Sequence, residues 1–167
     1  MFSDPFLLQQ VAELSELLLA QRKKLVTAES CTGGLIAALM TERAGSSKIF
    51  ERGFVTYSNA AKQTLLNVPL TILETQGAVS AECAEAMARG ALVNSRGDIA
   101  VSVTGIAGPG GETPLKPIGL VYIGLATDTQ SKAYEFRFSG SRSDIRSASC
   151  HEAFRLLIEA LSPVQLA

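Results

Sequence analysis

Apolar side chains recur every three to four positions near the start of the chain. The stretch over residues 5–22 carries them at Leu7, Val11, Leu14, Leu17 and Leu18. This spacing places them on one face of a helix, and Pro5 suits its first turn, where a backbone N–H is not needed. We therefore expect an amphipathic helix over residues 5–22.

Similar patterns predict further helices, over residues 33–43, 60–68, 69–77, 80–95 and 141–162. Thr32 and Ser80 stand at the start of two of these helices, where a hydroxyl can accept from a free backbone N–H. Pro69 separates the two short helices, because proline disrupts a helix interior.

Short apolar or alternating stretches predict strands over residues 24–30, 51–59, 98–105, 119–127 and 132–140. The second of these is expected to end at Tyr57. The early strands alternate with helices, whereas the last two are neighbours in sequence and resemble a hairpin. This order is typical of an α/β or α+β domain with a mixed sheet and helices on its faces.

Composition limits the class of protein. The chain has 167 residues, which suits one domain spanning residues 1–167. Hydrophobic residues make up 47% of the sequence and charged residues 19%, which is ordinary for a folded protein. The net charge of −1 and the lack of a basic run give no reason to expect a nucleic-acid or membrane partner. Apolar stretches are too short to span a bilayer, and no basic segment precedes them as in a signal peptide. We expect a cytoplasmic protein.

Histidine and cysteine are scarce, which restricts the available chemistry. A Ser-His-Asp triad would have to use His151, the single histidine. Cys31, Cys83 and Cys150 are widely spaced and odd in number, which indicates a reducing compartment and no zinc site. We expect no metal site and no cofactor.

Polar side chains gather at four points near predicted strand ends. These clusters are residues 30–34, residues 45–47, residues 57–59 with Lys62, and residues 104–105 followed by a glycine-rich loop. Ligands of open α/β sheets bind at the carboxyl ends of strands, so the clusters are expected to converge on one pocket.

Each candidate also has a plain structural interpretation. Gly33 and Gly34 could present backbone N–H groups to an anion, or simply allow close packing. Ser47 could be an exposed nucleophile or a turn serine. Lys62 could be a solvated lysine, or a buried one whose lowered pKa makes it a general base, with Tyr57 moving a proton.

Four ordered motifs together resemble the CinA C-terminal-domain family. They read TAESCTGGLIAALMT, GSSKIFERGFVTYSNAAKQTLLNV, GAVSAECAEAMARGA and VSVTGIAGPGGETPLKPIGLVYIGLAT. The resemblance runs from about residue 5 to residue 162. It implies a three-layer α/β/α domain with a mixed sheet and a nicotinamide-nucleotide amidohydrolase activity. In that reaction nicotinamide mononucleotide (NMN) becomes nicotinate mononucleotide and ammonia, in pyridine-nucleotide salvage, by a metal-independent serine/lysine mechanism.

The resemblance also implies roles for individual residues. Ser47 of the GSS motif is our expected nucleophile, with Lys62 as general base and Tyr57 assisting proton transfer. Thr104 would contact the reacting group or hold Lys62, and Ser30 is the rival nucleophile. Residues expected to bind the substrate are Thr32, Gly33, Gly34, Ser46, Gly105, Gly108, Gly110, Arg142 and Arg146. The two arginines, with the loop at 108–111, are candidates for the substrate phosphate.

Other functions fit the same sequence. The chain could be a catalytically silent nucleotide-binding domain or a partner in competence or DNA-damage responses, or it could hydrolyse a different small amide. A homodimer or higher homo-oligomer is expected from the apolar edge strands and first helix.

Overall fold

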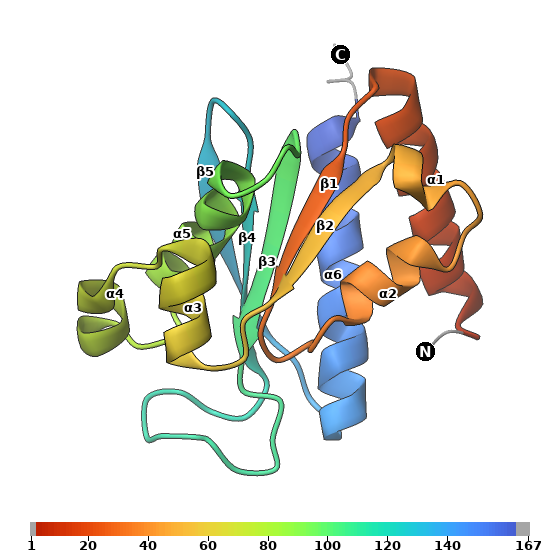
Figure 1. The fold of residues 1–167 in the computed structure, drawn as a ribbon. Helices are drawn as coiled ribbons and strands as arrows, with labels where there is room; N and C mark the ends of the chain where they lie inside the picture. The colour runs from red at the N-terminus through yellow and green to blue at the C-terminus, as the bar shows by residue number, and fades with distance from the viewer. Residues whose placement is uncertain (1–2, 163–167) are drawn as a thin grey trace, which may run out of the picture.

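Figure 1 shows the computed structural model, which describes residues 3–162 as a mixed sheet between two layers of helices. The strands are β1 (Leu25–Glu29), β2 (Phe50–Val55), β3 (Ile99–Gly105), β4 (Leu120–Ala126) and β5 (Ser131–Arg137). The helices are α1 (Pro5–Gln21), α2 (Leu35–Thr41), α3 (Asn59–Leu66), α4 (Leu70–Thr75), α5 (Ala81–Val93) and α6 (Arg142–Leu161), and a 3₁₀ turn, η1, covers Ser46–Lys48. None of the helices within residues 3–162 is long and apolar enough to cross a membrane.

The sheet has the order β2-β1-β3-β4-β5. β2, β1 and β3 run parallel, whereas β4 and β5 pair antiparallel with their neighbours. The carboxyl ends of β1, β2 and β3 therefore meet at one edge of the sheet. The expected three-layer α/β/α domain with a mixed sheet is confirmed.

The two faces of the sheet carry side chains of different size. On one face, Leu25, Val101 and Ile123 pack in a large apolar cluster with α1, α2 and α6. On the other face, the smaller residues Ala28 and Ala100 pack against α3, α4 and α5 (Figure 1). Side chains alternate between the two faces along a strand, so the position of a residue near a strand end determines which layer of helices its side chain faces.

Several element boundaries follow from hydrogen bonds at helix starts. Ser80 caps α5 as expected, by accepting from the backbone N–H of Cys83. The predicted cap at Thr32 is wrong, because α2 begins after Gly34, which has the positive φ of 98°. The strand predicted to reach Tyr57 ends at Val55, since Ser58 already caps α3.

Helix α3 lies in very close contact with α5. A Cβ built on Gly90 of α5 would lie 1.9 Å from the carbonyl oxygen of Leu66, the last residue of α3. Only glycine fits there, although glycine is unfavourable inside a helix. The position of α3 on the sheet therefore depends on the missing side chain at Gly90.

We predict that Gly90→Ala destabilises the protein by about 1–3 kcal/mol, because the added methyl group must push α3 away from α5. Helix propensity alone predicts the opposite sign, a gain of about 1 kcal/mol. Urea unfolding of the two proteins measures the difference. A Gly90→Ala protein as stable as the original, or more so, would contradict the close contact.

Candidate active site

A pocket of about 300 Å³ lies at the edge where the carboxyl ends of β1 and β3 meet. Its lining comes from five segments: residues 30–31, α3 with Tyr57 before it, residues 78–79, residues 104–108 with 110–111, and Arg142 at the start of α6. These segments include most of the polar strand-end clusters predicted from the sequence. Convergence at one edge therefore holds for three of the four clusters.

Ser30 and Lys62 form the central contact of this pocket. The Nζ atom of Lys62 lies 3.0 Å from Oγ of Ser30 and 2.8 Å from the carbonyl oxygen of Thr56. Only 1% of Lys62 and 9% of Ser30 is exposed to solvent. Ser30 stands two positions after Ala28, so its side chain lies on the same sheet face, against which α3 carries Lys62.

Burial lowers the pKa of Lys62 from its ordinary value, because the ammonium form loses water around its charge. The two hydrogen-bond partners of Nζ among the described residues, Ser30 Oγ and the Thr56 carbonyl, are neutral oxygens, so neither adds a negative charge that would favour the ammonium form. A neutral amine at this position can donate to the Thr56 carbonyl and accept the proton of the Ser30 hydroxyl.

Cys31 and Thr104 lie beside this pair but do not take part in its contact. Burial raises the pKa of the Cys31 thiol to about 11, so it stays protonated near neutral pH and is a poor nucleophile. The hydroxyl of Thr104 lines the pocket but donates to the carbonyl of Ala78 at 2.7 Å. The expectation that Thr104 holds Lys62 is not met.

The glycine turn before α2 does not offer its N–H groups to a ligand. The carboxylate of Glu29 accepts from the N–H groups of Gly34, Ile36 and Ala37 at 2.9–3.1 Å. Gly33 and Gly34 therefore form a turn whose positive end is already neutralised by this protein's own carboxylate. Sequence reasoning missed Glu29, whose only signal is a charged residue ending an apolar strand.

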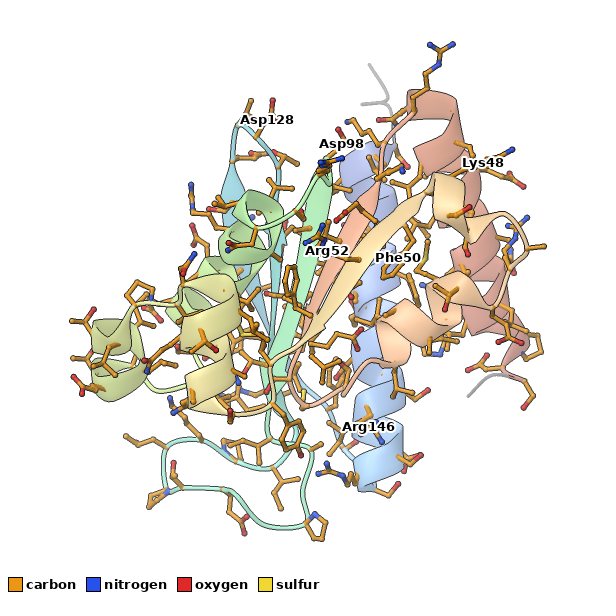
Figure 2. All side chains as sticks on the ribbon, viewed as in Figure 1. Lys48, Phe50, Arg52, Asp98, Asp128 and Arg146 are labelled. Atoms are coloured by element: carbon orange, nitrogen blue, oxygen red, sulfur yellow. The ribbon has the colours of Figure 1, made fainter. Side chains whose placement is uncertain are left out.

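The two candidate arginines behave differently. Arg142 lines the pocket and donates to the carbonyl of Gly108 at 2.7 Å and to the Tyr57 hydroxyl at 3.0 Å. Arg146, labelled in Figure 2, donates instead to the carbonyls of Cys31 and Thr32. Arg146 and Thr32 thus support the wall of the pocket and do not line it, contrary to expectation.

Ser46 and Ser47 lie far from this pocket. They belong to η1, which precedes β2, and β2 begins beside Leu25, at the start of β1. Lys48 and Phe50 mark that end of the sheet in Figure 2. The six residues of β2 separate the two edges by about 20 Å. The structure therefore does not bring Ser47 to Lys62, and the expected pairing of these two residues is corrected.

The loop after β3 lines the opposite side of the pocket. Gly105, Gly108 and Gly110 all contribute, as predicted, and the last two have φ values of 70° and 83°. Only glycine adopts such values readily, so backbone groups of this loop can approach a ligand closely.

The charges around the pocket favour an anion. Arg142 is a permanent cation in its lining, and none of the described side chains that line it is Asp or Glu. His151 lies elsewhere and hydrogen-bonds to Asp4 and Gln10. Within residues 3–162 no three His, Cys, Asp or Glu side chains are grouped as a metal site requires.

Residues 8–161 match the family model of the CinA C-terminal domain. A CinA-like protein of Mycolicibacterium vanbaalenii is 51% identical over 154 residues, which cover 92% of this chain and 35% of that protein. A CinA-like protein of Citrifermentans bemidjiense is 52% identical over 129 residues, which cover 77% of this chain and 31% of that protein. The chain thus spans about a third of the length of the curated relatives it matches.

Solved structures share the fold. The competence/damage inducible protein CihA from Agrobacterium tumefaciens is 44% identical, with a TM-score of 0.90 over 93% of this chain and 95% of that chain. The competence damage-inducible protein A (ComA) from Klebsiella pneumoniae is 33% identical, with a TM-score of 0.91 over 95% of this chain and 99% of that chain.

The lowered pKa of Lys62 predicts how stability changes with pH. Between its folded pKa and the ordinary value of about 10.4, the unfolded chain binds a proton at Lys62 that the folded chain does not. The contribution of Lys62 to the free energy of unfolding therefore becomes more favourable as pH rises and less favourable as pH falls.

We expect the free energy of unfolding of the original protein to increase with pH relative to that of Lys62→Met. Denaturant unfolding from about pH 6 to about pH 9.5 measures this trend. Lys48→Met is the control at an exposed lysine. A Lys62→Met difference that stays constant with pH would contradict a buried amine with a lowered pKa.

Proposed function

Because this chain belongs to the CinA C-terminal domain family, we propose that its pocket hydrolyses the carboxamide of NMN to nicotinate mononucleotide and ammonia. The observation that supports this most is the 3.0 Å contact between Ser30 Oγ and the buried amine of Lys62. A serine beside an amine with a lowered pKa is an activated nucleophile. Ser30 therefore replaces Ser47 as the proposed nucleophile.

In the first step, Ser30 Oγ attacks the carboxamide carbon while neutral Lys62 accepts the hydroxyl proton. The carbonyl oxygen becomes an oxyanion, for which the backbone N–H groups of Ala107, Gly108, Gly110 and Gly111 in the pocket lining are the proposed donors. The ammonium of Lys62 then gives its proton to the leaving nitrogen. The C–N bond breaks, ammonia leaves, and an ester joins the nicotinate carbonyl to Ser30.

In the second step, a water molecule attacks this ester while Lys62 accepts one of its protons. The C–O bond to Ser30 breaks, and the proton returns from Lys62 to Ser30 Oγ. The product carries a carboxylate in place of the amide. The Thr56 carbonyl, 2.8 Å from Nζ, holds the amine in place through both proton transfers.

The rest of the pocket suits the rest of the substrate. NMN carries a phosphate, and Arg142 provides a guanidinium at the open side of the pocket, beside the 61% exposed Tyr57. Arginine suits a phosphate because two of its N–H groups can bind two oxygens together. Arg142 is therefore the proposed phosphate ligand, and Tyr57 orients it.

We predict that Ser30→Ala lowers kcat for ammonia release from NMN by about 10³-fold or more, since the attacking oxygen is lost. Ser47→Ala is the matched control and should keep the original kcat. Coupled measurement of ammonia from purified proteins tests both. Full activity of Ser30→Ala would refute the assignment of the nucleophile.

The original protein itself separates the competing functions. Binding of NMN without ammonia release would favour a silent nucleotide-binding domain over an enzyme. Ammonia release from another small amide, but not from NMN, would favour an amidohydrolase of different specificity.

We also predict that Arg142→Gln raises KM for NMN by about tenfold to a hundredfold, as expected for a lost charge-assisted contact. The matching nucleoside, nicotinamide riboside, lacks the phosphate and should show little change between the two proteins. Steady-state kinetics with both substrates measures the two ratios. An equal loss for both substrates would contradict a phosphate contact.

A further inference from the structure

We infer that Glu29 is a positioning residue for Ser30, acting through the backbone of the turn that joins β1 to α2. This inference rests on the proposed role of Ser30 as nucleophile. Glu29 is only 1% exposed, and both of its carboxylate oxygens accept hydrogen bonds from α2. It is the residue directly before Ser30 in the chain.

The carboxylate replaces the cap that α2 lacks. The first N–H groups of a helix have no partner within the helix, and the capping position here is Gly34, which has no side chain to offer. Glu29 Oε2 accepts from the N–H groups of Gly34 and Ile36, and Oε1 accepts from that of Ala37. The end of β1 is thereby fastened to the start of α2.

The turn between these two points would otherwise be easy to deform. Gly33 and Gly34 have φ values of 63° and 98°, and glycine loses the most conformational freedom when it is held in one state. Arg146 of α6 holds the same turn from outside, through the carbonyls of Cys31 and Thr32. With both ends held, the direction in which the chain leaves β1 at Ser30 is fixed.

Glu29 does not act on the reacting groups directly. Its side chain extends to the face covered by α2, whereas the Ser30 side chain faces Lys62 on α3. Glu29 is also absent from the described lining of the pocket. Any effect on catalysis must therefore pass through the backbone of the turn, which distinguishes a positioning residue from a catalytic one.

The test is Glu29→Gln, which replaces one acceptor oxygen by an NH₂ group facing a backbone N–H. A displacement of about 1 Å in a reacting atom can cost about 10²-fold in rate. We expect kcat for NMN to fall about tenfold to a hundredfold, with KM within about threefold of the original. The rate at which a fluorophosphonate labels Ser30, followed by mass spectrometry, should fall in the same proportion.

Asp4→Ala is the matched control. Asp4 also caps a helix with its carboxylate, by accepting from the N–H groups of Phe6 and Leu7, but at α1. This variant should lose thermal stability and keep the original kcat and labelling rate. If Glu29→Gln behaves in the same way, losing stability only, the inference is overturned.

If Glu29→Gln does not fold, Glu29→Asp provides the same readouts, because it keeps the charge but is one methylene shorter. Its kcat and labelling rate should also fall, and original values would overturn the inference. Labelling separates this inference from the proposed function. If the original protein is labelled at Ser30 but releases no ammonia from NMN, the proposed substrate fails, and the labelling ratio still decides the role of Glu29. If the original protein is not labelled at Ser30, both the nucleophile and this inference fail.

Discussion

The amine of Lys62, withdrawn from water, is the constraint on which the pocket depends. A buried lysine costs free energy unless its nitrogen finds partners, and here those partners are the ends of two parallel strands, at Ser30 and Thr56. To deliver Nζ to that place, α3 must lie close to α5, which requires glycine at position 90. The small residues on that sheet face, such as Ala28 and Ala100, also allow α3 to lie close to the sheet, because larger side chains would push the helices away from it.

The alternation of side chains along β1 keeps the carboxylate of Glu29 away from the amine of Lys62. Glu29 and Ser30 are neighbours in sequence but extend to opposite faces of the sheet. The carboxylate is satisfied by α2, and the amine of Lys62 meets only neutral oxygens. A carboxylate beside Nζ would favour the ammonium form, so this separation keeps the amine available as a base.

Periodicity in the sequence predicted most of the fold and part of the site. Ser30, Lys62 and Thr104 were expected at one edge because each belongs to a polar cluster at or just after the end of a strand, and parallel strands end together. Ser47 was misplaced because its cluster precedes the strand predicted over residues 51–59, whereas the other three clusters lie at or just after the ends of strands. A cluster before a parallel strand lies at the amino edge of the sheet, opposite the edge that bears the pocket.

Contacts with the backbone account for the remaining errors. Arg146 stands four positions after Arg142 and so shares its helix face, but it donates to the carbonyls of Cys31 and Thr32 and does not line the pocket. Glu29 was missed for the same reason, because its partners are backbone N–H groups, which nearly every residue type possesses. The identity of a residue predicts whether its side chain can bind a ligand. It does not show whether that side chain is already hydrogen-bonded to backbone groups of the protein.

The contact between Arg146 and the Cys31 carbonyl joins residues 115 positions apart. During synthesis the turn that bears Ser30 leaves the ribosome more than a hundred residues before α6, the helix that holds this turn through Arg146. Until α6 has been made, the glycines of the turn lack that restraint. The geometry around Ser30 would therefore be completed only when α6 docks.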